Sequence, residues 1–522
     1  MPVFGDDEEC GALLGEVDGK VTHRLRKQRY RPPLCTWQQG LLCIVLTAVL
    51  SLESISQYRA HYCSHISAST LEETIYHILN ETKSKSQFQI PVDDSHSMDD
   101  DWESFREDYQ QRFNKTVTPD SLRPWLRYAQ KHQCNERDYY DGIETDLQVF
   151  RDIIVAQGNQ KFRQEDIVAK GANQTSFYMV LQLQNHKWTM LDTVDYHKKG
   201  PLPLMKIEKQ LQWLMEPVRA HRPAINNTFF FNLHDGARNK DSDRPIFSTC
   251  KQAYWTDDVA IPTDEEVVNL LVNDMTRFPF QQHNYQTYNG QVQDDHKMDA
   301  GIRDVLIPFY NNLPTGHAGN EPLIYPLRSP FDERDNSIVW RGSTTGPWGW
   351  GPRFKLVQTY GGDNVTFFVI DRNNKEDSIK VDFGFTLIVQ GKNKTLPPHS
   401  RMADYMSYSD MQRHKYVMDV DGNSFTERFP SLLESGSLVF KSTRYREWFT
   451  DRLVAYRDYI PVNYNQSDLA EKVAWAHKNA ELTAQITQHA RRTVQKQMRT
   501  EDMRCYVYRL MMEYQTLFEE TP

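Results

Sequence analysis

One stretch of the chain decides its fold class: residues 415–443, KYVMDVDGNSFTERFPSLLESGSLVFKST. An apolar run rich in strand-forming residues ends in Asp-Gly-Asn, a sequence that favours a turn. The following SFTERFPSLLES has the spacing of a short helix, which we expect to begin near Ser424. A second apolar run begins at Leu438. Strand, helix and strand in this order predict a parallel α/β unit.

Outside this stretch, short apolar runs alternate with segments of helical spacing. The runs predict a β-hairpin at 176–184 and 187–196, and strands at 227–235, 336–342 and 383–391. Helices are expected at 143–152, at 207–221 and over most of 468–519, where helix breakers are few. The chain is therefore predicted to be an α/β protein with parallel sheets.

The composition excludes several classes of protein. The chain has 522 residues, a formal net charge of −9 and 12% aromatic residues. Disordered chains lack so many aromatic side chains, so most of the chain should fold around a large core. The acidic balance argues against nucleic acid as a partner, because proteins that bind it are usually basic. A mean hydropathy of −0.69 excludes a protein with many membrane spans.

One uncharged stretch, residues 32–52, just reaches the length of a bilayer-spanning helix, which needs about 20 residues. Basic residues stay cytoplasmic, so those before it predict a cytoplasmic tail at 1–31, a signal anchor at 32–52 and a luminal stem at 53–114. A cleaved signal peptide and a buried helix are the two alternatives. The basic residues are Arg24, Arg26, Lys27, Arg29 and Arg31.

Sequons and cysteines favour the same orientation. N-glycans are expected at seven Asn-x-Ser/Thr sequons, which all follow the apolar stretch: Asn80, Asn114, Asn173, Asn226, Asn364, Asn393 and Asn465. Four cysteines also follow it, an even number that suits an oxidising compartment: Cys63, Cys134, Cys250 and Cys505. The chain does not end in an ER-retrieval tetrapeptide.

A candidate general base follows one of the predicted strands. In NTFFFNLHDGAR, residues 227–238, the apolar run ends in His234, Asp235 and Gly236. Ligands of open α/β sheets bind beyond the carboxyl ends of the strands, where Asp235 could accept a proton. An Asp that caps the next turn or helix explains the same pattern, so both interpretations stay open from the residues alone.

Two further loops have the composition of phosphate-binding sites. Residues 337–357 place Gly-Ser-Thr-Thr-Gly after a strand, with Arg353 at the start of a helix, although a simple loop explains this pattern equally well. In 415–443, Arg428 falls in the first turns of the expected helix, where a guanidinium and a helix N-terminus would bind a diphosphate. Asp419 and Asp421 could instead form a metal-binding Asp-x-Asp pair, but the turn that follows argues against it.

Together these segments resemble glycosyltransferase family 90, the capsule-associated type that includes the protein O-glucosyltransferases. The resemblance covers roughly residues 115–515 and is nearest to the fungal capsule xylosyltransferase branch. The matching motifs occur in family order: CNERDYYDGIETDLQVFR (134–151), FNLHDGAR (231–238), WRGSTTG (340–346), the 415–443 stretch and REWFTDRLVAYRDYIPV (446–462).

The resemblance implies a GT-B fold, in which two Rossmann-like domains face each other across a cleft. Residues 115–325 would form the acceptor-side domain, 326–465 the UDP-sugar domain, and 466–522 a helical segment that returns to the first domain. The catalytic Asp of the family matches Asp235, and a disulfide would join Cys134 to Cys505. The donor-binding positions match Ser343, Thr344, Thr345, Arg353, Asn423, Ser424, Phe425, Thr426, Glu427 and Arg428.

The resemblance also implies an inverting transfer that needs no metal and no other cofactor. Xylose or glucose would pass from a UDP-sugar to a hydroxyl of a glycan or glycoprotein. Two departures matter: Thr344 stands where animal protein O-glucosyltransferases have a basic residue, and PWGWGP delays Arg353. With the anchor, they favour a type II Golgi membrane enzyme with a luminal catalytic region. The alternatives are a transferase for Ser of secreted protein domains and an inactive sugar-binding protein.

Overall fold

The computed structural model describes the following residues: 98–115, 119–134, 140–171, 178–194, 202–221, 227–233, 244–252, 260–272, 304–308, 327, 329–389 and 395–519. They belong to one compact unit, Met98–Pro522. The expected cytoplasmic tail and signal anchor lie outside the described residues. Within the described part, no helix combines the length and the apolar character needed to cross a membrane.

A five-stranded mixed sheet has the order β2-β1-β3-β4-β6. Its strands are β1 (Tyr178–Gln184), β2 (Lys187–Val194), β3 (Asn227–Asn232), β4 (Ile246–Ser248) and β6 (Asp304–Leu306). The hairpin predicted at 176–196 is confirmed, since β1 and β2 pair antiparallel. Its two-residue turn, Asn185 and His186, has positive φ at both positions, as a tight hairpin requires. β1 also pairs antiparallel with β3, so the prediction of parallel strands holds here only for β3, β4 and β6.

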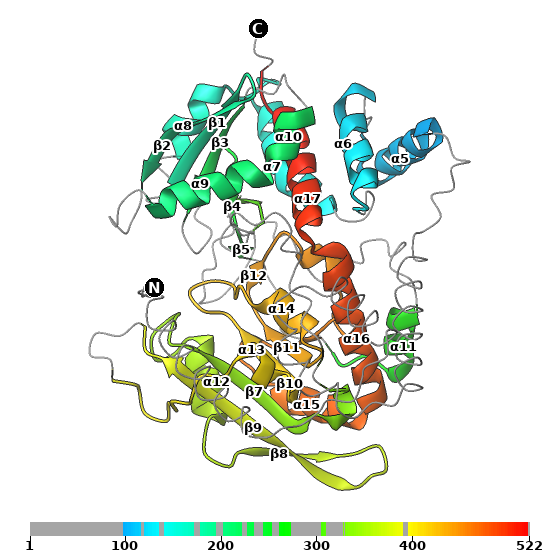
Figure 1. Cartoon of the computed structure of the whole chain (residues 1–522), viewed down its shortest axis with the longest axis vertical. Helices are drawn as coiled ribbons and strands as arrows, with labels where there is room; N and C mark the ends of the chain where they lie inside the picture. The colour runs from blue at the N-terminus through cyan, green and yellow to red at the C-terminus, as the bar shows by residue number, and fades with distance from the viewer. Residues whose placement is uncertain are drawn as a thin grey trace, which may run out of the picture. The chain divides into compact units, whose positions relative to one another are not determined.

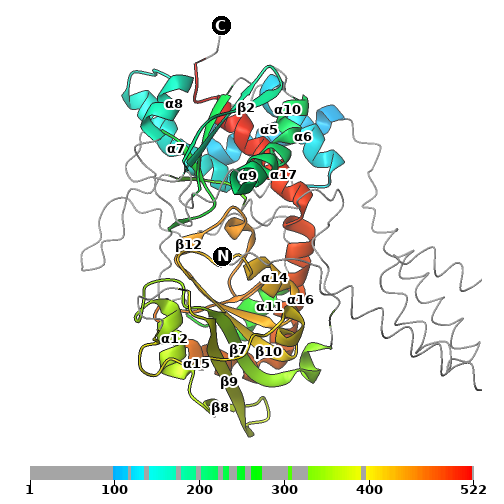
Figure 2. The same cartoon turned by 60° about the vertical axis from the view of Figure 1, so that its left-hand side comes forward.

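A second sheet has six strands in the order β13-β11-β10-β7-β9-β8. Figure 2 labels four of them, β10, β7, β9 and β8. Its first five strands run parallel, and β8 adds antiparallel to β9 at the edge. The α/β prediction is therefore confirmed for this part of the chain. The strands are β7 (Asp335–Ser343), β8 (Thr366–Ile370), β9 (Glu376–Leu387), β10 (His414–Val420), β11 (Leu438–Ser442) and β13 (Ile460–Pro461).

The central strands of the second sheet bury both faces. Val339, Val417 and Val439 are neighbours by register and pack in one hydrophobic cluster with side chains of α14 (Phe429–Glu434). Tyr416 and Phe440 point to the other face and join a second cluster with α12 (Pro352–Tyr360) and α15 (Leu469–Lys478). Because both faces are covered, the strands read as nearly continuous apolar runs in the sequence.

The C-terminal helices confirm the helical prediction for 468–519. α16 (Ala480–Gln497) packs on α14, which belongs with the second sheet. α17 (Thr500–Gln515) packs against α6, α7 and α10 (Figure 1). These three helices and the five-stranded sheet are called the first part below, and the six-stranded sheet with its helices the second part. A disulfide joins Cys505 in α17 to Cys134, which is the pairing that the resemblance implies. The remaining helices are α6 (Pro119–Lys131), α7 (Asp141–Ala156), α8 (Gln164–Gly171), α9 (Leu202–Leu214), α10 (Glu216–His221), α11 (Asp264–Val272) and α13 (Tyr408–Met411). The shortest elements are β5 (Lys251–Gln252), β12 (Tyr445–Arg446) and the 3-10 turns η3 (Phe331–Glu333) and η4 (Thr450–Arg452).

The predicted stem is too long at its C-terminal end. Residues Met98–Phe113 form helix α5, and Trp102, Phe105 and Tyr109 of this helix are buried in the core. Their spacing of three and four residues is that of one helix face, but the acidic residues around them resemble a solvated linker. The assignment of these residues to a stem is therefore wrong.

Two predicted helices have different bounds. α14 begins at Phe429, five residues later than expected, because Ser424–Arg428 form a loop whose Thr426 hydroxyl binds Asp419. Arg428 is therefore the N-cap residue of a short helix and does not lie in its first turns. The helix predicted at 207–221 is divided into α9 and α10 next to Pro217, which cannot donate a helical backbone hydrogen bond.

Candidate functional site

The loops that follow β7 and β10 lie against each other, because these two strands are neighbours in the sheet. The backbone N–H of Gly346 in the first loop donates to Asn423 Oδ1 in the second, at 2.9 Å. Gly346 has a φ of 103°, and a Cβ there would lie 2.7 Å from the carbonyl oxygen of Gly422. Glycine is required on both grounds. The fold thus brings together the two loops that the sequence analysis singled out for phosphate binding.

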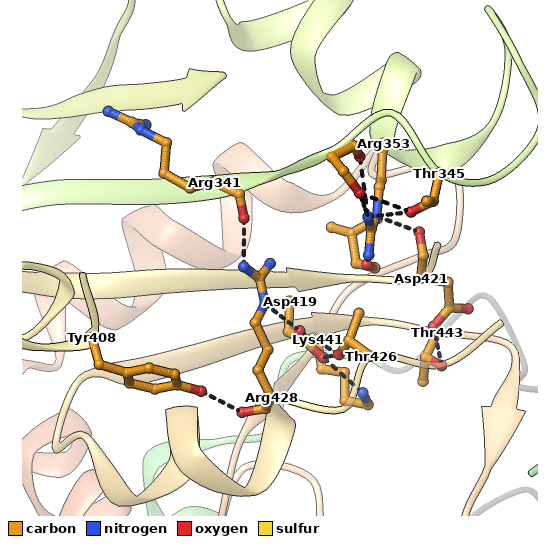
Figure 3. Close-up of polar contacts among 12 residues, drawn as sticks. Arg341, Thr345, Arg353, Tyr408, Asp419, Asp421, Thr426, Arg428, Lys441 and Thr443 are labelled. Carbon is orange, nitrogen blue, oxygen red and sulfur yellow. Dashed lines mark hydrogen bonds and ion pairs between the residues drawn. The ribbon is translucent and has the colours of Figure 1, made fainter. Parts of the chain in front are cut away.

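Arg353, in α12, connects these two loops (Figure 3). Its Nη1 donates to Thr345 Oγ1 at 2.6 Å and to the carbonyl oxygen of Ser343 at 3.1 Å, while Nε donates to the carbonyl oxygen of Asp421 at 3.1 Å. Desolvation, together with the positive charge of Arg428, lowers the pKa of Arg353 to about 10. Two guanidinium groups close enough to repel each other are a ready site for an anion.

Arg428 is the second cation of the site. Its Nε lies 3.4 Å from Asp419 Oδ1, and its Nη1 donates to the carbonyl oxygen of Arg341 on β7 (Figure 3). Tyr408 donates its hydroxyl to the carbonyl oxygen of Arg428 at 3.1 Å. Nη2 of Arg428 is buried, and no described residue accepts a hydrogen bond from it. Leaving a buried donor unsatisfied is costly, so this nitrogen is the strongest candidate for contact with an anionic ligand.

Asp419 holds the loop and Arg428 in place from the end of β10. It accepts a hydrogen bond from Thr426 Oγ1 at 2.6 Å and lies 2.8 Å from Lys441 Nζ on β11. Burial acts to raise the pKa of Asp419, but Lys441 and Arg428 outweigh it and the net shift is downward. Asp419 is thus an ionised carboxylate whose contacts are internal to the protein.

Asp421, two residues further on, has a different environment. It accepts hydrogen bonds from Thr443 Oγ1 at 2.6 Å and from the backbone N–H of Arg444 at 2.7 Å, both neutral donors. Burial is the largest influence and raises the pKa of Asp421 to about 7. Because both aspartates bind protein donors, their geometry disfavours the Asp-x-Asp metal alternative. In the part of the chain that the structure describes, no cluster of three acidic, His or Cys side chains could hold a metal.

The other predicted donor-binding residues differ in exposure. Thr344 is fully buried, and its Oγ1 accepts a hydrogen bond from the backbone N–H of Val389 at 3.0 Å. This hydroxyl binds the segment that follows β9, and the role of Thr344 in UDP binding stays a prediction from the resemblance. In contrast, the hydroxyls of Ser343 and Thr345 lie 3.3 Å apart beside Arg353. The second loop has buried Ser424, Phe425 and Thr426, and exposed Asn423 and Glu427.

The predicted base, Asp235, lies outside the described residues. The strand before it is described: β3 ends at Asn232, whose Nδ2 donates to Ser248 Oγ on β4 at 3.0 Å. All six residues of β3 are buried, so the strand lies within the core and the chain leaves the sheet at its carboxyl end. The role of Asp235 stays a prediction that rests on the resemblance and on its position three residues after this strand.

Sequence reasoning missed two charged residues beside the loops. Lys441 lies in a buried apolar strand and neutralises Asp419. Glu447, 5% exposed, has its pKa raised well above the usual range, mainly by burial and further by nearby acidic groups. A signal was present for Lys441, since a single Lys within SLVFKST is unusual in a buried strand. No comparable local signal marks Glu447.

Glu447 directly follows β12, which pairs antiparallel with β5 and so joins the two parts of the unit. Arg446 reaches Asp146 of α7, with Nη1 3.3 Å from Oδ1, and Asp146 also pairs with Lys251 of β5. Trp448 packs against Tyr506 of α17. The aromatic segment at 446–449 therefore has a packing role.

With this geometry in hand, the chain can be compared with known proteins. Residues 374–522 match the model of glycosyl transferase family 90. This segment belongs to that family. It contains β9, β10, β11, the loop with Arg428 and the C-terminal helices. The family model does not extend to WRGSTTG or to Asp235, so the upstream part of the resemblance stays a prediction.

Relatives of known function match over short stretches. Protein O-glucosyltransferase 3 of Rattus norvegicus is 33% identical over 144 residues, which is 27% of this chain and 28% of the relative. O-glucosyltransferase rumi of Drosophila pseudoobscura pseudoobscura is 30% identical over 115 residues, 22% of this chain and 28% of the relative. The chain thus matches less than a third of the length of these two relatives. A crystal structure of TarM aligns over 34% of this chain and 35% of its own, at 17% identity and a TM-score of 0.25.

Proposed function

We propose that this protein is an inverting glycosyltransferase that moves a sugar from a UDP-sugar to a hydroxyl of a glycan or glycoprotein, without a metal. One observation carries the proposal. Within a family 90 segment, Arg428 has a buried guanidinium nitrogen for which no described residue is an acceptor, and its positive charge acts on Arg353. A diphosphate would supply the missing acceptor and relieve the repulsion between the two cations.

The residues suit a single displacement. The acceptor oxygen attacks the anomeric carbon while its proton passes to the Asp235 carboxylate, and the bond from that carbon to the diphosphate oxygen breaks. UDP leaves with the electron pair, and its growing negative charge is stabilised by fixed donors. Arg428 and Arg353 supply charge, and the hydroxyls of Ser343 and Thr345 supply hydrogen bonds. Asp419 acts by positioning Arg428 and not by binding a metal.

A GT-B arrangement is part of this proposal. The two sheets, the return of α17 to the first part and the family match support it. The base would then come from the first part and the donor site from the second. This architecture places proton transfer and nucleotide binding on different sheets, which makes them separable by mutation.

The identity of the sugar and of the acceptor is inferred from the relatives and from the sequence outside the site. The names of the relatives favour glucose and a protein acceptor, whereas the predicted anchor and the departures around Thr344 favour a Golgi glycan substrate and xylose. A type II membrane enzyme with a luminal catalytic region is compatible with both. An inactive sugar-binding protein would also use Arg428 to bind the diphosphate, so the transfer assay distinguishes it from an active enzyme.

The test uses the full-length chain in detergent with radiolabelled UDP-xylose, UDP-glucose and UDP-galactose. Each donor is offered a mannose-rich oligosaccharide, a secreted disulfide-bonded domain with exposed Ser, or water alone. We expect one donor to give a transfer product in which the configuration of the anomeric carbon is inverted relative to the donor. The Asn variant, Asp235→Asn, should not form this product. Binding of UDP without transfer to any acceptor would favour the inactive alternative, and failure to bind UDP would contradict the proposal.

A further inference from the structure

β8 exposes an apolar face that no described element covers. Side chains alternate along this edge strand: Phe367 and Val369 are buried in the cluster that contains α15, whereas Phe368 and Ile370 point outward. Phe368 is 88% exposed, the highest value among the large apolar side chains of the described residues, and Ile370 is 52% exposed. Such a side chain pattern on the edge strand of a sheet invites pairing with another chain.

The charges around this face give it little protection. In the β8–β9 register, Phe368 lies opposite Ser378, and Ile370 lies opposite Glu376. Lys380, opposite Thr366, and Glu376 are the two charged residues of β9 that pair with β8 on this face, one near each end, and the residue opposite Phe368 is uncharged. Natural edge strands are usually blocked by several charges, by proline or by a covering element. β8 is the last strand of the sheet order, so its outer backbone groups face away from β9 (Figure 2).

A sequon lies at the start of this strand. Asn364 is exposed and occupies the turn between α12 and β8, and Thr366, the hydroxyl residue of the sequon, is the first residue of β8. Alternate residues of a strand point to one face, so Thr366 shares the outward face with Phe368, about 7 Å further along. Asn364 precedes Thr366 by two residues, so a bulky, hydrated glycan on Asn364 would begin close to the first residue of this strand.

We propose that an N-linked glycan on Asn364 covers the apolar face of β8 and prevents this sheet edge from pairing with a second copy of the chain. In the secretory lumen, the amide nitrogen of Asn364 forms a bond to the anomeric carbon of the glycan, the bond from that carbon to the diphosphate of a lipid-linked donor breaks, and the lipid diphosphate leaves with the electron pair while the amide loses a proton. This inference goes beyond the proposed activity and requires only that Asn364 enter the secretory lumen. The other described sequons, Asn114 and Asn465, are also exposed but do not adjoin such a face.

The test compares single replacements that remove one glycan each. Asn364 and Asn114 both have positive φ, 62° and 50°, a region that Asp tolerates well, so Asn364→Asp and Asn114→Asp are matched changes. Asn465→Asp is a second control, and Thr366→Ala removes the same glycan as Asn364→Asp by a different change. Full-length proteins are produced in a eukaryotic cell and cross-linked in intact membranes, and glycopeptides are measured by mass spectrometry.

We expect the Asn364 peptide to carry a glycan. Asn364→Asp and Thr366→Ala should form several-fold more cross-linked dimers and larger products of this chain than the wild type, whereas Asn114→Asp and Asn465→Asp should match the wild type. Adding Phe368→Lys to Asn364→Asp should return the protein to the wild-type level. An unmodified Asn364 in the folded wild type, equal self-association of all sequon variants, or cross-links only to a different protein would overturn the proposal.

Enzymatic removal of glycans from the folded protein covers the case in which Asn364→Asp fails to fold. Treated wild type should self-associate, and treated Phe368→Lys should not. Equal behaviour of the two treated proteins would count against the role of this face.

Discussion

The ends of two buried strands, β3 and β10, carry the two halves of the proposed chemistry, and they differ in how the protein supports them. The carboxyl end of β10 is followed by a loop that is held by many internal contacts: Asp419 with Lys441, Thr426 with Asp419, and Arg353 with the neighbouring loop. β3 has a simpler setting, an all-buried strand whose last residue binds Ser248.

This contrast teaches that donor and acceptor chemistry place different demands on a fold. Stabilising a leaving diphosphate requires several charges at fixed positions, and each buried charge needs a partner of its own. Removing one proton requires one carboxylate at the end of a strand. The family model begins at residue 374, so it covers β9, β10, β11 and β13 of the second sheet and no strand of the first.

The largest effect should come from β3. Asp235→Asn preserves the size of the side chain and removes its basicity, so sugar transfer should fall by about 100-fold or more, while UDP affinity stays unchanged. Transfer rate and UDP affinity are measured on the same protein, with Asp192→Asn on β2 as the control. If Asp235 only caps a turn, the variant will lose about 1 kcal/mol of stability at most and keep its turnover.

The next effect concerns β10. Arg428→Ala should weaken UDP binding by roughly 1.5–3 kcal/mol, the usual contribution of a hydrogen bond to a charged group. Calorimetry of UDP binding measures this change. Arg413→Ala is a matched control, because Arg413 precedes the same strand at its opposite end and is 62% exposed. Normal UDP affinity in a folded Arg428→Ala protein would show that the diphosphate lies elsewhere.

A smaller effect, on the pH dependence of stability, distinguishes Asp419 from Asp421 near the end of β10. The folded-state pKa of Asp421 is raised to about 7, so the folded protein keeps a proton that the unfolded chain releases above its lower, normal pKa. Stability should therefore decrease as pH rises from about 4 to 7, by at most about 1.4 kcal/mol for each pH unit from this group. Asp419 has a lowered pKa, so its contribution is lost in the opposite direction, as pH falls below its normal value.

Asp421→Asn isolates that contribution, because Asn resembles the neutral acid and can keep both hydrogen bonds. Denaturant unfolding at several pH values should show the variant gaining on the wild type as pH rises. Two parallel curves would mean that Asp421 titrates normally despite its burial.

The smallest expected effect is that of chelation. Because Asp419 and Asp421 bind protein donors, EDTA should leave most of the transferase activity. Activity is measured with EDTA alone and after manganese is added back. If EDTA abolishes the transferase activity and manganese restores it, the Asp-x-Asp metal alternative is favoured over a site that uses only the cationic side chains of the protein.

Much of the second sheet could be predicted from sequence. KYVMDVD, SLVFKST and NSIVWRG form β10, β11 and β7, because continuous apolar runs between turn residues are typical of strands buried on both faces. Helix α5 was missed because its charged residues outnumber the aromatic ones that it buries. α14 begins late because the hydroxyl of Thr426 binds Asp419, a contact that no helical periodicity reveals.

The sequence by itself determined the α/β class, the two loops at the ends of β7 and β10, and the family of residues 374–522. Only the tertiary structure decided how the loop side chains are engaged: Thr344 binds Val389, Thr426 binds Asp419, and a nitrogen of Arg428 has no acceptor among the residues that the structure describes. The physical reason is the distance along the chain between the residues that interact. Strands, turns and helices follow from local backbone preference and burial periodicity, whereas the state of a charge depends on partners such as Lys441, 22 residues from Asp419, that meet it only in the folded chain.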